Sequence, residues 1–171
     1  MKMLKDLSST TEVAARATAV MRNLTDRNWC ISTAESCTGG LVAALFTDIE
    51  GCSHAFDRGF VVYSEEAKVA LLGVDPKLLE EKGAVSKEVA LAMAEGAVMR
   101  SNADIAVAVT GFAGEADTED KAGLVHMALC RRGGSTVHQA KNWGAQERDK
   151  VRQLSLLALL EMLEGALGRK P

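Results

Sequence analysis

The sequence predicts an α/β fold, a layered α/β/α arrangement around a mixed sheet that includes a C-terminal antiparallel hairpin. Segments with helical spacing of apolar residues alternate with short β-branched segments up to about residue 111, which is typical of strands joined by helices. Two strand-like segments then flank Gly133 and Gly134, a pair that favours a hairpin turn. Because no repeat, linker or low-complexity stretch divides the chain, we expect a single domain over residues 1–171.

Capping residues place the helices. Ser9 and Glu12 form a capping box at the start of the first helix, and Ser86 occupies the N-cap position of a later one. Asp75 followed by Pro76 is typical of a helix start. The expected helices are 9–27, 38–48, a short one from 65 to the closing Gly73, one beginning at 75, 86–101 and 146–167.

Composition places the strands. Residues 103–111, ADIAVAVTG, are apolar and β-branched throughout, which favours a central strand that is covered on both faces. The other expected strands are 29–34, 59–64 and the two strands of the hairpin, 123–131 and 135–143.

The composition also excludes several function classes. Twenty basic and 23 acidic residues give a formal charge of −3 with no basic stripe, so no nucleic-acid partner is expected. The apolar runs are too short to span a membrane and the N-terminus lacks a secretory apolar core, so we expect a cytoplasmic protein with no membrane partner. The cysteines and histidines show no metal-ligand spacing, so no metal site is expected.

The last expected helix predicts a homodimer or a higher homo-oligomer. Its apolar residues spread over more than one face, and a second copy could cover the face that the sheet leaves open. Burial between two elements of the same chain is the alternative. The residues concerned are Leu154, Leu156, Leu157, Leu159, Leu160, Met162 and Leu163.

The stretch TAESCTGG, residues 33–40, places polar side chains where the first strand turns into a helix. Ligands of α/β proteins bind at the carboxyl ends of the strands, so this loop is a candidate site. If the helix begins near Thr38, the free N–H groups of Thr38, Gly39 and Gly40 point outward and can hold an anion or an oxyanion. Ser36 is then placed like a nucleophile on a tight turn, and an ordinary helix cap is the alternative.

A serine nucleophile needs a base, and no histidine lies near this loop. A lysine can serve if burial keeps it neutral, and Lys68 follows the second expected strand. Tyr63, at the end of that strand, could donate a hydrogen bond to the serine or to a substrate. The alternatives are a solvated surface lysine and a tyrosine packed in the core.

Four motifs occur in a fixed order: TAESCTGG, FDRGFVVYSEEAK, GAVSKEVA and a T-G-x-A-G loop. As a set they resemble the C-terminal domain of the competence/damage-inducible protein (CinA) family, which includes nicotinamide mononucleotide deamidases, from about residue 10 to the end. The resemblance implies an amidohydrolase that converts nicotinamide mononucleotide to nicotinic acid mononucleotide and ammonia. It therefore implies a small-molecule nucleotide substrate and no metal or redox cofactor.

The resemblance also implies roles for single residues. Ser36 matches the family's nucleophile, and Lys68 and Tyr63 match its catalytic lysine and tyrosine. Ser36 rather than Cys37 is then the nucleophile, since successive side chains of a tight turn point in different directions. The residues implied in substrate binding are Glu35, Cys37, Thr38, Gly39, Gly40, Gly111, Ala113, Gly114 and, for the substrate phosphate, Arg148.

Two positions depart from the family pattern. Glu65 stands where the family usually has Asn, and we expect it to point to solvent, because a carboxylate facing Lys68 would favour the charged lysine. In the loop 111–123, Glu115 replaces a proline, and Ala116 and Asp117 replace glycines. Added carboxylates near a phosphate would each cost on the order of 1 kcal/mol.

The acidic loop leaves other interpretations open. A divalent-metal site is a rival interpretation, and a solvated loop is favoured over it because no calcium-loop spacing is present. A non-catalytic nucleotide-binding or regulatory module of the same fold is the alternative to the amidohydrolase.

Overall fold

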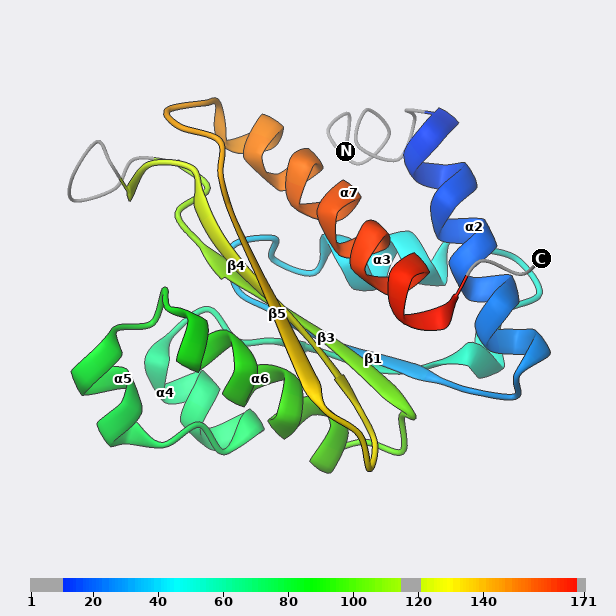
Figure 1. The fold of residues 1–171 in the computed structure, drawn as a ribbon, viewed down its shortest axis with the longest axis horizontal. Coiled ribbons are helices and arrows are strands. Elements are labelled where there is room, and N and C mark those ends of the chain that lie inside the picture. The colour runs from blue at the N-terminus through cyan, green and yellow to red at the C-terminus, as the bar shows by residue number, and fades with distance from the viewer. Residues whose placement is uncertain (1–10, 115–120, 169–171) are drawn as a thin grey trace.

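The computed structural model describes residues 11–114 and 121–168, and the described strands form one five-stranded sheet in the order β2-β1-β3-β4-β5 (Figure 1). β1 (Ile31–Glu35) pairs in parallel with both β2 (Phe56–Val61) and β3 (Ile105–Gly111). β4 (Leu124–Arg131) and β5 (Thr136–Asn142) extend the sheet as an antiparallel hairpin. The predicted α/β fold with a mixed sheet is confirmed.

Helices cover both faces of this sheet, which gives three layers (Figure 1). One face carries α2 (Thr11–Asp26), α3 (Leu41–Thr47) and α7 (Arg148–Leu167). The other face carries α4 (Glu65–Ala67), α5 (Pro76–Lys82) and α6 (Lys87–Met99). Two shorter turns complete the described elements, the 3-10 turn η1 (Ser53–Ala55) and the π-helical turn η2 (Lys68–Leu72).

The central strand β3 divides the core by side-chain size. Ile105, Val107 and Val109 belong to the cluster that α2, α3 and α7 cover, while Ala106 and Ala108 belong to the cluster on the α6 side. Successive side chains of a strand point to opposite faces, so this alternation gives each face its own core. The small alanines allow α6 to pack close to the sheet, where its Ala97 carbonyl oxygen accepts a hydrogen bond from Ser32 of β1.

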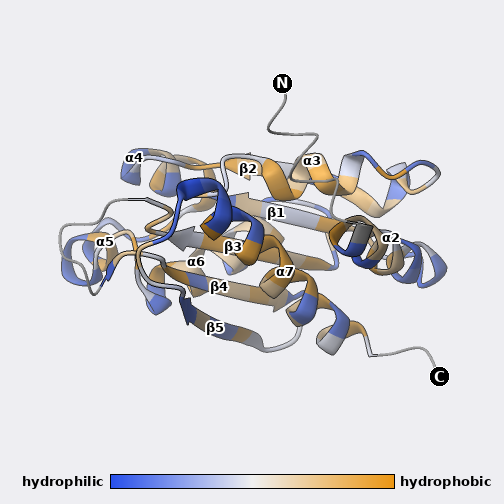
Figure 2. Ribbon diagram, turned by 90° about the horizontal axis from the view of Figure 1, so that it is seen from above, coloured by the Kyte–Doolittle hydropathy of each residue, from blue (hydrophilic) through white to orange (hydrophobic). Residues whose placement is uncertain are grey.

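The helix α7 buries most of its leucines within the same chain. Figure 2 shows a hydrophilic beginning of α7 and a mainly hydrophobic middle. Leu156, Leu159, Leu160 and Leu163 are buried in the core shared with α2. Burial inside the chain, the alternative raised above, therefore accounts for most of the apolar width of α7, and the homodimer stays a prediction.

Three expected elements have different limits in the structure. The helix expected from residue 38 begins at Leu41, because Gly39 and Gly40 have φ angles of +62° and +96°, which no right-handed helix contains. β2 ends at Val61 instead of residue 64. The helix expected over 65–73 changes at Lys68 from α-helical to π-helical geometry.

Some predictions fall outside the described residues. The capping residue Ser9 and the loop positions that depart from the family pattern, Glu115, Ala116 and Asp117, belong to this group. Over the described ranges, none of the helices combines the length and the apolar character that a membrane span requires.

Candidate active site

The carboxyl ends of the three parallel strands bring the candidate residues to one edge of the sheet. Ser36 follows β1 directly, and its N–H donates a hydrogen bond to the Val109 carbonyl of β3 at 3.0 Å. On the other side of β1, the Val62 N–H donates to the Glu35 carbonyl at 2.8 Å. The serine is therefore fixed between the ends of both neighbouring strands, as binding sites of α/β sheets are.

Lys68 reaches Ser36 from the segment after β2. Its Nζ lies 3.3 Å from Ser36 Oγ, 2.9 Å from the Val62 carbonyl oxygen and 3.3 Å from the Tyr63 carbonyl oxygen. Lys68 is only 1% exposed and Ser36 only 8% exposed, so this contact is screened from water. Sequence spacing did not reveal the contact, since 32 residues separate the two positions.

Burial changes the protonation of this lysine. It lowers the pKa of Lys68, while the charge of Glu65 and the neighbouring Cys37 raise it by smaller amounts. Glu65 is exposed, as expected from the sequence, and among the described residues its carboxylate is not a hydrogen-bond partner of Lys68 Nζ, although the Lys68 N–H donates to the Glu65 carbonyl oxygen. Burial therefore favours the neutral amine, the form that can accept the proton of the Ser36 hydroxyl.

Glu35 has a different place from the one expected. Its carboxylate is buried beneath the start of α3 and accepts four hydrogen bonds, from Thr38 Oγ1 at 2.7 Å and from the N–H groups of Gly40, Val42 and Ala43 at 3.0, 3.0 and 2.8 Å. A carboxylate at a helix N-terminus satisfies donors that lack a partner within the helix. We therefore reassign Glu35 from substrate binding to holding the turn after β1.

The glycine pair does not supply the free N–H groups that the sequence suggested. The Gly39 N–H donates to the Ser36 carbonyl oxygen at 3.1 Å, and the Gly40 N–H donates to Glu35. The helix begins only at Leu41, so these donors close the turn. Thr38 is also fully buried, and its hydroxyl donates to Glu35.

Cys37 is buried in the hydrophobic core. It belongs to the cluster under α3 and α7, and burial raises the pKa of its thiol to about 12. The positive charges of Arg148 and Arg152 lower that pKa by smaller amounts, which places both arginines near the turn. A thiol with this pKa carries almost no thiolate near neutral pH, so it is a poor nucleophile.

Tyr63 contributes to the site mainly through its backbone. Its carbonyl oxygen accepts a hydrogen bond from Lys68, whereas its side chain is 68% exposed. Within the described part of the chain, the Tyr63 side chain is neither packed in the core nor hydrogen-bonded to Ser36. Its ring is open to a bound molecule.

The loop after β3 brings part of its expected residues to the same edge. A Cβ atom on Gly114 would stand 3.8 Å from the Arg148 guanidinium, so loop and helix meet here. Ala113 is buried, and Gly111 lies tightly against Val125 of β4, where a Cβ would come within 2.6 Å. Gly114 and the exposed Arg148 can meet a ligand, while Gly111 and Ala113 shape the loop.

Sequence reasoning missed Arg152. Its guanidinium donates to the Thr38 carbonyl oxygen, and a Cβ on Gly39 would stand 3.1 Å from its Nη2. Its Nε is buried without a hydrogen-bond partner in the part of the chain that the structure describes. The signal was available, because Arg148 and Arg152 are four residues apart and share a helix face.

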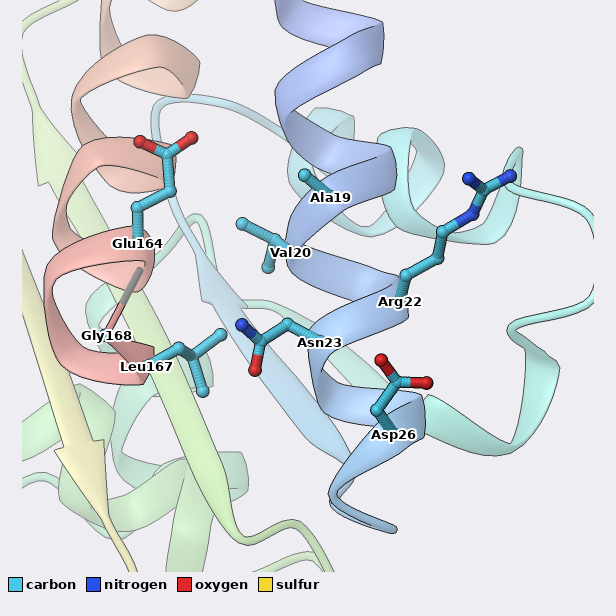
Figure 3. Close-up of a pocket in the computed structure, with 8 residues that line it drawn as sticks. All are labelled: Ala19, Val20, Arg22, Asn23, Asp26, Glu164, Leu167 and Gly168. Atoms are coloured by element: carbon cyan, nitrogen blue, oxygen red, sulfur yellow. The ribbon is translucent and has the colours of Figure 1, made fainter. Parts of the chain in front are cut away.

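Two pockets lie away from Ser36. The larger has a volume of about 520 Å³ and lies between α2 and the end of α7 (Figure 3). It is lined by Ala19, Val20, Arg22, Asn23, Asp26, Glu164, Leu167 and Gly168. The smaller, of about 300 Å³, lies between α2 and the end of α3. Neither pocket is lined by Ser36 or Lys68.

The residues described do not form a metal centre. No group of three or more histidine, cysteine, aspartate or glutamate side chains converges within ranges 11–114 and 121–168. His126 and His138, on the neighbouring strands β4 and β5, contact each other through Nδ1 and Nε2 at 3.0 Å.

Comparison with known proteins gives a consistent assignment. The family model for the CinA C-terminal domain matches residues 13–167. The competence/damage inducible protein CihA from Agrobacterium tumefaciens is 43% identical and has a similar structure, with a TM-score of 0.86 over 91% of this chain and 94% of that one. A CinA superfamily protein from Escherichia coli is 32% identical, with a TM-score of 0.83 over 88% of each chain.

Curated relatives are longer than this chain. A CinA-like protein from Geobacter sulfurreducens is 45% identical over 152 residues, which cover 88% of this chain and 36% of the relative. The chain thus spans little more than a third of the length of this relative. The likeness concerns one domain of it.

Proposed function

We propose that this chain, which belongs to the CinA C-terminal domain family, is a serine amidohydrolase that releases ammonia from the carboxamide of nicotinamide mononucleotide. The contact between Lys68 Nζ and Ser36 Oγ, at 3.3 Å in a buried setting, carries the proposal. It pairs a nucleophile with a base whose pKa burial lowers. The likeness to nicotinamide mononucleotide deamidases supplies the substrate.

The three oxygen atoms around Nζ suit a change between ammonium and amine. As an ammonium, Lys68 has a proton for each of the Ser36, Val62 and Tyr63 oxygens. As an amine it still donates to the two carbonyl groups and turns its lone pair to the Ser36 hydroxyl. The backbone thus holds the base in place in both protonation states.

The proposed reaction has two halves. Lys68 takes the Ser36 proton while Oγ attacks the carboxamide carbon, and the resulting ammonium gives its proton to the departing amide nitrogen, which leaves as ammonia. In the second half, the amine takes a proton from water as the water oxygen attacks the ester carbon. The ester bond breaks, Ser36 regains its proton, and nicotinic acid mononucleotide leaves.

The rest of the site suits an anionic nucleotide. Arg148 is exposed beside Gly114, and Arg152 lies one turn further along α7 against Gly39. We infer that Arg148 binds the phosphate while Arg152 adds positive charge behind the turn. We also infer that the exposed ring of Tyr63 contacts the pyridine ring.

Ammonia release from nicotinamide mononucleotide by the purified protein tests this proposal, with Ser36→Ala as the control. Release by wild type and its loss in Ser36→Ala would support the amidohydrolase. Binding of the nucleotide without ammonia release would contradict it and favour the non-catalytic module. Release from a different small amide only would keep the chemistry and reject the substrate.

A further inference from the structure

The segment that carries Lys68 has an unusual backbone. Lys68–Leu72 form the π-helical turn η2, in which the Gly73 N–H donates to the Lys68 carbonyl oxygen five residues earlier. The turn ends at Gly73, which has a left-handed φ of +73°. π-Helical turns are rare and frequently occur at functional sites, where the extra residue changes the direction of neighbouring side chains.

Gly96 of α6 lies directly against the end of this turn. A Cβ atom at Gly96 would stand 2.1 Å from the Leu72 carbonyl oxygen and 3.0 Å from its carbonyl carbon. No side chain fits at such a distance, and the obstacle is backbone, which cannot rotate away. The position is therefore one where two main chains approach so closely that only glycine is compatible.

Two side chains of the turn are held in the protein interior. Leu72 is 2% exposed and Lys68 is 1% exposed, whereas Ala70 and Leu71 of the same turn face solvent. On its sheet side, α6 is packed through Ala90, Ala94 and Ala97 in the cluster that includes Ala106 and Ala108 of β3. Close-packed elements of this kind transmit a displacement instead of absorbing it.

We propose that Gly96 is a positioning residue for the Ser36–Lys68 pair, because its missing side chain lets η2 sit against α6 and so holds Lys68 Nζ within reach of Ser36 Oγ. A Cβ would push the turn away by about 1 Å, and a displacement of that size can cost about 10²-fold in rate. The contact from Nζ to Oγ, at 3.3 Å, is already long for a hydrogen bond. The kinetic consequence rests on the proposed function, whereas the structural consequence does not.

The test is the variant Gly96→Ala with Gly165→Ala as its matched control. Gly165 lies in α7, and a Cβ there would meet no atom within 4 Å. For Gly96→Ala we expect kcat for ammonia release to fall about 10²-fold with a much smaller change in KM. We also expect the rise of kcat/KM with pH, which follows the loss of the Lys68 proton, to move to higher pH, because a displaced Lys68 regains water. Gly165→Ala should match the wild type in both.

A crystal structure of Gly96→Ala gives a readout that needs no activity. We expect the distance from Nζ to Oγ to exceed hydrogen-bond range, and an unchanged distance of 3.3 Å would overturn the proposal. If the wild type releases no ammonia, the proposed function fails while this comparison still decides the role of Gly96. Wild-type kcat and pH profile in folded Gly96→Ala would also overturn it.

If Gly96→Ala does not fold, Gly73→Ala takes its place. Alanine at position 73 strains the backbone directly after the turn, because Gly73 has a left-handed φ of +73°, and its Cβ would meet the flexible Arg100 guanidinium at 2.7 Å. We expect a loss of roughly 10-fold in kcat with the same alkaline displacement of the profile. An unchanged kcat and profile there would overturn the proposal.

Discussion

The nucleophile and the base of the candidate site are held in different ways. The turn that carries Ser36 is held by directed polar contacts, since one carboxylate, Glu35, binds Thr38 and three N–H groups at the start of α3. Lys68 is held by burial and by carbonyl oxygens. For Lys68, position and reactivity therefore share one cause, because the packing that fixes it also lowers its pKa. For Ser36 the two have different causes, because the Glu35 contacts fix its position and the contact with Lys68 activates it.

The largest expected effect separates the two potential nucleophiles of the turn. Ser36→Ala should lower ammonia release by on the order of 10⁴-fold or more, because the attacking oxygen is lost. Cys37→Ala should keep near wild-type turnover, because the Cys37 thiol is buried, with a pKa raised to about 12. Initial rates at saturating substrate measure both. Loss of turnover in Cys37→Ala with activity in Ser36→Ala would reverse the assignment.

Glu35→Gln breaks the polar side of the comparison. The amide cannot accept four hydrogen bonds as the carboxylate does, and its NH2 group would face N–H donors. We expect a loss of about 2–3 kcal/mol in the free energy of unfolding, since hydrogen bonds to charged groups contribute about that much. Urea denaturation measures it. The exposed Glu65→Gln is the control and should leave the stability near that of the wild type; an equal loss in both would contradict the role of Glu35.

The contrast between the two residues also explains what the sequence could reveal. The fold class followed from the alternation of strand and helix patterns, and the loop at Ser36 followed from its place after a strand. The direction of the Glu35 carboxylate did not follow, because the sequence places the helix start at residue 38 whereas the structure places it at residue 41. Only the left-handed φ angles of Gly39 and Gly40 decide between them.

The environment of Lys68 depended on contacts between distant parts of the chain. Its motif and the resemblance predicted a base, but its burial depends on the π-helical turn η2 and on α6, and no local propensity marks a π turn. Arg152 was missed for a similar reason, since its role arises from packing against Thr38 and Gly39. Spacing within α7 indicated only that it shares a face with Arg148.

Glu65→Gln sharpens the electrostatic side of the comparison. The charge of Glu65 raises the pKa of Lys68 against the larger lowering by burial. Removing that charge should lower the pKa of Lys68 further, so the rise of kcat/KM with pH should move to lower pH. The displacement should be small, because Glu65 is exposed and its charge is screened by water. A profile measured at constant ionic strength tests this. A displacement to higher pH would contradict the account of Lys68.

The smallest expected effect lies outside the site, at the His126–His138 pair. Burial lowers the pKa of both rings, so the unfolded chain binds more protons than the folded one as the pH falls below about 6.5. The pair therefore contributes stability that is present above that pH and is lost as the pH falls through the lower folded pKa values. His138→Gln should reduce this loss by less than about 1 kcal/mol, given the partial exposure. Thermal unfolding at several pH values measures it; an equal reduction in the exposed His54→Gln would contradict it.

The pH dependence of kcat/KM, measured for the wild type and for Lys68→Met, tests the central claim most directly. A neutral Lys68 must take the Ser36 proton, so the wild-type value should rise with pH through one ionisation that lies below the ordinary lysine pKa of 10.5. Lys68→Met should lose about 10²- to 10⁴-fold or more in rate, and the ionisation should vanish. Near wild-type turnover with the same profile in Lys68→Met would contradict the claim that Lys68 activates Ser36.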